Sequence, residues 1–134
     1  MLESKQIAKN FSIDEFKCRD GVSVPWDLVE NVIMLAKNLQ ILRDRVGVPI
    51  TVISGYRSPL YNKSIDGAKR SFHMKAMAAD IRVKGMSPGD VRGVIEELIE
   101  AGHGGGPGMS QGGLGSYRSF THYDIRGTKA RWSK

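Results

Sequence analysis

The 134-residue sequence contains one cysteine, Cys18, and a single thiol excludes an intramolecular disulfide. It has no apolar run near the ~20 residues that a helix needs to cross a bilayer, which argues against membrane insertion. Residues 1–5 also lack the apolar stretch of a secretory signal, so we expect synthesis in the cytoplasm without a signal peptide. The fold must therefore be held by its hydrophobic core and by any metal that it binds.

The charge is unbalanced, with 20 Lys and Arg against 14 Asp and Glu and a formal net charge of +6. Such a surplus suits an anionic partner, such as nucleic acid, a membrane surface or an acidic cell-wall polymer. The basic residues are dispersed, and no arginine-rich block or nucleic-acid motif is present, so we expect no nucleic-acid partner. The alternative is a charge that serves solubility alone.

The length suits a single domain spanning residues 1–134 with one core. Ser12 and Glu15 have the spacing of a capping box, which predicts a short helix. A longer helix follows Pro25 and ends at Gly47, because apolar residues there step by three and four along one face: Leu28, Val32, Leu35, Leu39, Leu42 and Val46.

Mixed helices and strands follow in the rest of the chain. We expect strands at 50–53, 78–83 and 120–126, a helix at 88–102 that is capped by Ser87, a glycine-rich loop at 104–115 and an anchoring side chain at Trp132. This alternation with short connections predicts a compact α+β domain with an antiparallel sheet and flanking helices.

A histidine and an aspartate lie seven positions apart in the segment 71–80, separated by small residues. Zinc accepts an imidazole nitrogen and a carboxylate oxygen at ~2.0–2.2 Å, so His73 and Asp80 are candidate metal ligands. The pair by itself is weak evidence, because most His and Asp residues at such a spacing do not bind metal.

A second segment, 120–124, contains a His-x-Asp pair. Alternate residues of a strand share a face, so His122 and Asp124 are expected to point the same way. His122 then completes a set of two histidines and one carboxylate, which leaves a fourth coordination position open, as in catalytic zinc sites. The alternative is a surface His–Asp pair bonded to each other.

Three ordered motifs resemble a known family. Ser71-x-His73-x-x-Ala76-x-Ala78-x-Asp80 is similar to the Ser-x-His-x-x-Gly-x-Ala-x-Asp signature of the zinc D-alanyl-D-alanine peptidases, the M15 peptidase family. The segment 52–58 resembles that family's Ser-Gly-Tyr-Arg-Ser motif, and 120–124 resembles the C-terminal His-x-Asp segment of its small branch. The resemblance covers residues 11–132.

The resemblance implies a hedgehog-like or LAS-type fold and one zinc ion per chain, with His73, Asp80 and His122 as ligands. It implies that Arg57 holds a substrate carboxylate or polarises the scissile carbonyl, a task that suits the arginine fork. Ser71 is implied in orienting substrate. The alternatives are a loop salt bridge for Arg57 and a backbone-bonding turn residue for Ser71.

The sequence departs from the family pattern at two positions. Ala76 replaces the signature glycine, which is costly only if the backbone there has a positive φ. Ser119 stands where many members carry the catalytic acid, so we expect Asp124 to act as the general base, with Asp66 or Glu97 as other candidates. Asp124 has an alternative role, in which it orients a histidine that binds the metal.

We therefore expect a monomeric metallopeptidase that hydrolyses peptidoglycan peptides as a D,D-carboxypeptidase or endopeptidase. The absence of a signal fits a phage-type endolysin released to the cell wall by lysis, or a cytoplasmic enzyme that acts on muropeptides. The competing interpretation is a non-catalytic, zinc-stabilised wall-binding module, which the loss of the acid at Ser119 favours. Tyr56, Tyr117 and Tyr123 either line the cleft or pack in the core.

Overall fold

A computed structural model describes residues 5–134 of the chain. It contains three α-helices, three short 3-10 helices and seven strands within these residues. In chain order they are β1 (Gln6–Ala8), β2 (Phe11–Ser12), η2 (Ile13–Phe16), η3 (Trp26–Leu28), α1 (Val29–Val46), β3 (Ile50–Ser54), α2 (Pro59–Ser64), η4 (Phe72–Lys75), β4 (Ala78–Val83), α3 (Pro88–His103), β5 (Gly113–Ser116), β6 (Thr121–Asp124) and β7 (Ala130–Ser133).

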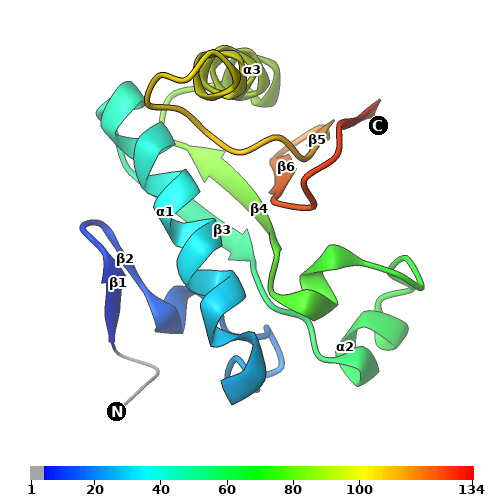
Figure 1. Ribbon diagram of the computed structural model, residues 1–134. Helices are drawn as coiled ribbons and strands as arrows, with labels where there is room; N and C mark the ends of the chain where they lie inside the picture. Colours follow the sequence, from blue (N-terminus) through cyan, green and yellow to red (C-terminus); the bar gives the residue numbers. More distant parts are fainter. Residues whose placement is uncertain (1–4) are drawn as a thin grey trace.

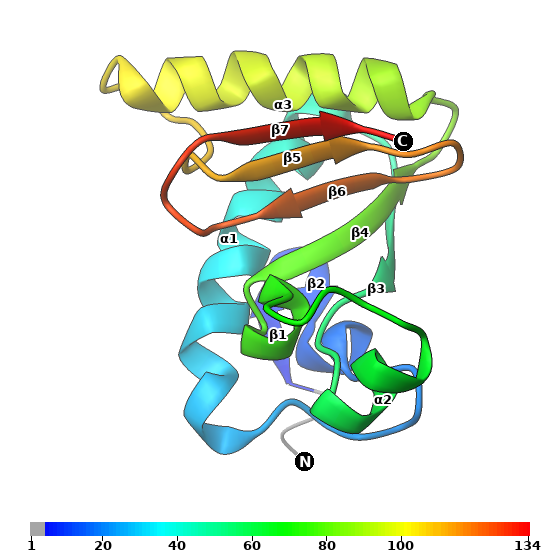
Figure 2. The same ribbon diagram turned by 90° about the vertical axis from the view of Figure 1, so that its right-hand side faces the viewer.

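Five strands form the main sheet in the order β3-β4-β6-β5-β7 (Figure 2). All neighbours in it pair antiparallel except β5 and β7, which pair parallel. The remaining strands, β1 and β2, form a separate hairpin. The predicted α+β class with a mostly antiparallel sheet is therefore confirmed.

The hydrophobic core lies between the sheet and the two long helices. α1 packs on one side of the sheet, and α3 lies beside α1 and runs along β4, β5 and β6 (Figure 1). The predicted stripe of α1 is buried at its centre, where Val32, Leu35, Leu39 and Leu42 are almost inaccessible to solvent. Its ends, Leu28 and Val46, are only partly buried. Helical periodicity therefore identified the packed face correctly.

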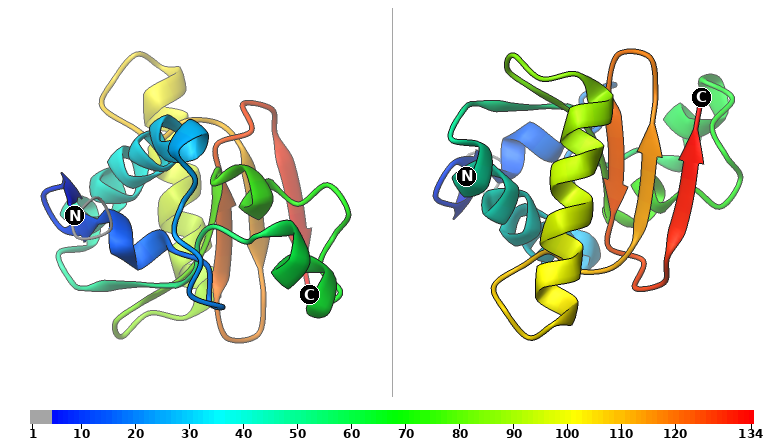
Figure 3. Two further views of the ribbon diagram at one scale, coloured as in Figure 1. Left: turned by 90° about the horizontal axis from the view of Figure 1, so that it is seen from below. Right: turned by 90° about the horizontal axis from the view of Figure 1, so that it is seen from above.

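The far side of the sheet carries a different layer. α2 lies on the opposite side of the strands from α1, in the long connection between β3 and β4 that also contains η4 (Figure 3). Helix α2 begins at a Ser58 cap, whose hydroxyl accepts a hydrogen bond from Tyr61 N–H. This layer stands beside the centre of the sheet and forms one wall of a cleft.

Two expectations need correction. The predicted loop at 104–115 ends earlier, because Gly113–Ser116 form β5 and pair with strands on both sides. Trp132 is more than an anchor near the end, since it belongs to the edge strand β7. Among residues 5–134 no helix is both long and apolar enough to span a membrane.

Candidate metal centre

Sheet pairing brings two of the three predicted metal ligands together. Asp80 on β4 lies directly opposite His122 on β6, and cross-strand partners of this kind have neighbouring side chains. Both side chains are buried, although they come from positions 42 residues apart in the chain. The register between β4 and β6 therefore creates the centre of the site.

The third predicted ligand, His73, lies on η4. The Ser71 hydroxyl begins this short helix by accepting a hydrogen bond from His73 N–H at 3.2 Å. His73 Nδ1 lies 2.7 Å from the carbonyl oxygen of Gly55, an acceptor, so this nitrogen carries the ring proton. The lone pair of Nε2 is thereby directed at Asp80, whose Oδ1 lies 3.3 Å away.

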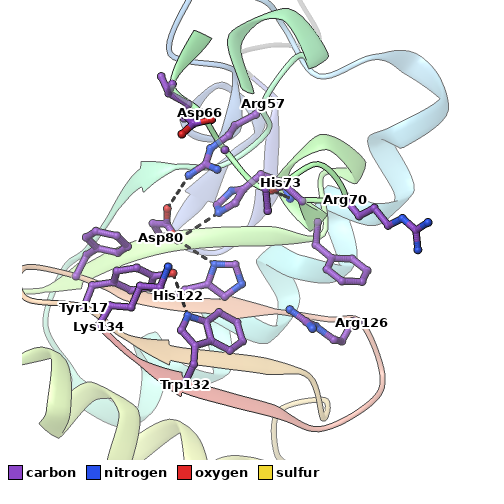
Figure 4. Close-up of a pocket in the computed structure, with 16 residues that line it drawn as sticks. Arg57, Asp66, Arg70, His73, Asp80, Tyr117, His122, Arg126, Trp132 and Lys134 are labelled. Carbon is purple, nitrogen blue, oxygen red and sulfur yellow. Dashed lines mark hydrogen bonds and ion pairs between the residues drawn. The ribbon is translucent and has the colours of Figure 1, made fainter. Parts of the chain in front are cut away.

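The three ligand atoms converge with the spacing of a metal site. His122 Nδ1 lies 3.1 Å from the same Asp80 Oδ1, and all three atoms lie within 4.8 Å of one another (Figure 4). A tetrahedral zinc ion with ligand bonds of ~2.0–2.2 Å separates its ligand atoms by roughly 3.4 Å. Two imidazole nitrogens and one carboxylate oxygen also form a donor set that zinc accepts. His73, Asp80 and His122 thus fit a zinc ion.

Arg57 balances the charge of the aspartate. Its Nη2 donates to Asp80 Oδ2 at 3.1 Å, which leaves Oδ1 to the histidines. Nε donates to Ser54 Oγ and Nη1 to Asn62 Oδ1, so three partners fix the guanidinium. Burial alone would raise the pKa of Asp80, but its interactions with the adjacent His122 and His73 rings hold that pKa well below its usual range. Asp80 is therefore an anion available to a metal.

Asp124 occupies the opposite edge of the His122 ring. Its Oδ2 lies 2.7 Å from His122 Nε2, while Nδ1 of that ring faces Asp80. Its carboxylate also accepts hydrogen bonds from Gly113 N–H and from the Arg126 guanidinium. The side chain is fully buried and is not among the residues that line the cleft. The base role stays a prediction, and the observed position is that of a group that orients His122.

The other residues weighed as acids or substrate contacts fall in different places. Ser71 lines the cleft while its hydroxyl caps η4. Ser119 is exposed and lies outside the cleft, and Glu97 pairs with Arg45 on the surface. Asp66 lines the cleft, but the Arg57 side chain lies between it and Asp80 (Figure 4). Apart from Asp80, it is the only carboxylate that lines the cleft among the described residues.

Ala76, which replaces the signature glycine, has a φ of +55°. This is the costly case for a residue with a Cβ, since the left-handed region is strained for alanine. Ala76 ends η4 directly after the segment that carries His73, and its N–H donates to His73 C=O at 3.2 Å. The chain therefore keeps the turn that a glycine would favour and places His73 with it.

The cleft above the cluster has a volume of about 500 Å³ and a basic, aromatic lining. The cations on its walls are Arg57, Arg70, Arg126 and Lys134. Arg126 lies over the rings of Phe72, at 4.5 Å, and Trp132, at 5.5 Å. The sequence reading missed Arg126, although it continues the two-residue spacing of His122 and Asp124.

Glycines on β5 make room for this arrangement. A Cβ on Gly115 would lie 2.3 Å from the indole nitrogen of Trp132, and one on Gly113 would lie 2.2 Å from Asp124 Oδ2. Gly115 pairs with His122 on one side and Trp132 on the other, so the indole can lean across it to within 5.0 Å of the His122 ring. A larger residue at either position would therefore collide with the side chain of Trp132 or Asp124.

The family model described as Peptidase M15 matches residues 9–124, which is most of the chain and includes all three candidate ligands. A search of curated proteins found no match. The matched span, together with a His-Asp-His cluster that fits a metal, supports the same assignment as the motifs. The chain belongs to the peptidase M15 family.

Proposed function

We propose that this M15 peptidase is a zinc-dependent hydrolase of bacterial peptidoglycan peptides, acting as a D,D-carboxypeptidase or an endopeptidase. The observation that carries the proposal is the convergence of His73, Asp80 and His122 on the floor of an open cleft, with Arg57 beside them. A zinc ion held there would supply Lewis-acid chemistry, polarising a carbonyl and acidifying water.

The charge of the cleft supports an acidic peptide as substrate. Four cationic side chains line it, whereas Asp66 and Asp80 are its only carboxylates among the described residues. Asp80 is already balanced by Arg57, so the cleft as a whole is positive. Stem peptides of peptidoglycan carry free carboxylates, from D-glutamate and from the C-terminus, and such anions complement these cations.

In the proposed mechanism, Arg57 donates hydrogen bonds to the substrate oxygen that gains negative charge. Its guanidinium is held in advance by Ser54, Asn62 and Asp80, so little reorganisation is required when the substrate reacts. Asp124 and Arg126 keep His122 in one tautomer and orientation. The chain's own residues thus contribute chiefly by positioning and by stabilising charge.

The experiment is digestion of purified peptidoglycan, with zinc measured on the same sample. We expect one zinc per chain and new muropeptide products whose masses identify the bond that is cut. Chelation followed by zinc addition should remove and restore the products. Zinc binding without any cleavage would favour the second candidate, a zinc-stabilised wall-binding module. The feature that supports that candidate is Ser119, where many family members place an acid.

A further inference from the structure

We infer that Tyr117 is a further catalytic residue, which donates a hydrogen bond from its hydroxyl to the scissile carbonyl oxygen of the substrate. This inference rests on the proposed peptidase function and assigns a second donor, on the wall of the cleft opposite to Arg57. Four observations support it: the placement of Tyr117 in the cleft, the restraint on its ring, the hydrogen bonding of its hydroxyl, and the space at Gly115 that positions the Trp132 indole.

Tyr117 lies immediately after β5 and lines the cleft together with all three candidate ligands. Gly115, two residues earlier, pairs with His122, and alternate residues of a strand share a face. The side chain of Tyr117 is therefore expected on the face that carries His122. Figure 4 confirms this placement, with the Tyr117 ring entering from the opposite side of Asp80 to Arg57.

The ring of Tyr117 is held by its surroundings. Tyr117 N–H donates to the carbonyl oxygen of Phe120 at 3.0 Å, which closes the turn between β5 and β6. The two rings stack, with centroids 4.4 Å apart and planes 12° from parallel. Offset stacking of this kind restrains the ring, so the hydroxyl occupies a fixed position in the cleft.

The hydroxyl has an unused proton. The indole N–H of Trp132 donates to Tyr117 Oη at 2.9 Å, and because an indole nitrogen cannot accept, the direction of this bond is fixed. No hydrogen bond among residues 5–134 takes the proton of the Tyr117 hydroxyl itself. Tyr123 differs, since its hydroxyl donates to the carbonyl oxygen of Ser110 at 2.7 Å in the core. Tyr117 is thus a donor with its proton available to a ligand.

The position of the indole depends on Gly115. The strand register places Trp132, Gly115 and His122 side by side on three adjacent strands. Because residue 115 has no side chain, the indole of Trp132 can lie over it toward His122. The indole then contacts the His122 ring at 5.0 Å while it donates to Tyr117. This arrangement aims the Tyr117 hydroxyl at the part of the cleft next to the metal ligands (Figure 4).

The chemistry of peptide hydrolysis requires such a donor. The carbonyl oxygen gains negative charge as water adds, and donors already aimed at it stabilise the transition state more than the ground state. Arg57 supplies one donor from the α2 side of the cleft, and Tyr117 supplies the other from the β5 side. No proton needs to leave the tyrosine in this role.

The test is Tyr117→Phe, which removes one oxygen and keeps the stacked ring. Tyr61→Phe is the matched control, because Tyr61 is half-buried and lies outside the cleft lining. We expect kcat for muropeptide hydrolysis to fall by roughly 10²–10³ in Tyr117→Phe, with zinc content and KM nearly unchanged. The control should keep the wild-type kcat. A zinc-loaded Tyr117→Phe protein with wild-type kcat would overturn the inference.

A second measurement separates this inference from the proposed substrate. Acetohydroxamate, a small zinc-binding anion, is titrated into zinc-loaded wild type and Tyr117→Phe by calorimetry. Loss of a hydrogen bond to a charged group should weaken its binding roughly 10-fold or more. This difference is expected even if wild type fails to cleave peptidoglycan, which would refute the proposed function alone. Equal dissociation constants in the two proteins would overturn the role of Tyr117.

Discussion

Asp124→Asn is the substitution that discriminates best between a base and an orienting carboxylate. Each oxygen of Asp124 receives more than one donor: Oδ1 accepts from Gly113 N–H at 2.8 Å and Arg126 Nε at 2.9 Å, and Oδ2 accepts from His122 Nε2 and Arg126 Nη2, both at 2.7 Å. An asparagine must place an NH₂ group on one side. In either orientation the NH₂ group would face hydrogen-bond donors instead of acceptors, in a site that is fully buried.

The size of the effect follows from that burial. Removing one partner of a buried ion pair typically costs about 3–5 kcal/mol. The Arg126 side chain is 23% exposed, so water can solvate part of its charge, and we expect the lower end, about 3 kcal/mol. Zinc affinity should fall ~10–100-fold, because the carboxylate that fixes the His122 tautomer is lost.

The assays are denaturant unfolding of the metal-free protein and zinc titration against a competing chelator. Asp14→Asn is the control: Asp14 pairs with Lys17 at 3.4 Å with half its side chain exposed, so the change should stay under about 1 kcal/mol. An Asp124→Asn protein with wild-type stability and zinc affinity, but without hydrolysis, would refute the orienting role. That result would establish the base role predicted from the sequence.

Four further predictions concern the residues of the site. His122→Ala should abolish stoichiometric zinc binding, and Arg57→Ala should keep zinc but lower kcat by roughly 10²–10³, as checked by metal analysis and muropeptide kinetics. Gly115→Ala should displace the indole, because its Cβ would lie 2.3 Å from the indole nitrogen, and altered tryptophan fluorescence with a lower Tm would show this. Zinc affinity should rise as the pH rises above ~6.5, since zinc displaces a proton from His122. Burial alone would lower the pKa of that imidazole, but hydrogen bonds to Asp124 and Asp80 raise it.

The metal-free protein should also lose stability in acid, with the sign set by Asp124. Burial alone would raise the pKa of this carboxyl, yet hydrogen bonds from His122 and Arg126 lower it below its ordinary value. A lowered folded-state pKa contributes stability that is present above the unfolded pKa of ~4 and is lost as the pH falls below it. Denaturant midpoints between pH 3 and 6 would show the loss, and a flat profile would contradict it.

Local patterns in the sequence determined much of this molecule. The three-and-four spacing from Leu28 to Val46 identified the packed face of α1, and the run 78–83 matches β4. Ordered motifs identified the family and the three candidate ligands. These features depend on contacts within one element or on residue types at fixed spacing, so the linear order carries them.

Only the tertiary structure decided how the cluster is oriented. Alternation correctly put His122 and Asp124 on one face, but it does not state which ring nitrogen faces which carboxylate. The β4–β6 register and the Gly113 and Arg126 donors direct Nδ1 to Asp80 and Nε2 to Asp124. Asp124 therefore contacts the edge of the His122 ring that faces away from Asp80, and it does not line the cleft.

The glycine-rich segment 104–115 is a second case in which local sequence patterns did not predict the structure. Glycine is depleted in strands, so local propensity predicted a loop through residue 115. The chain instead forms β5, which pairs with β6 on one side and β7 on the other, and the side chains of Asp124 and Trp132 occupy the space above Gly113 and Gly115. Asp124 follows Gly113 by 11 residues and Trp132 follows Gly115 by 17 residues, so these contacts arise only when the strands are paired.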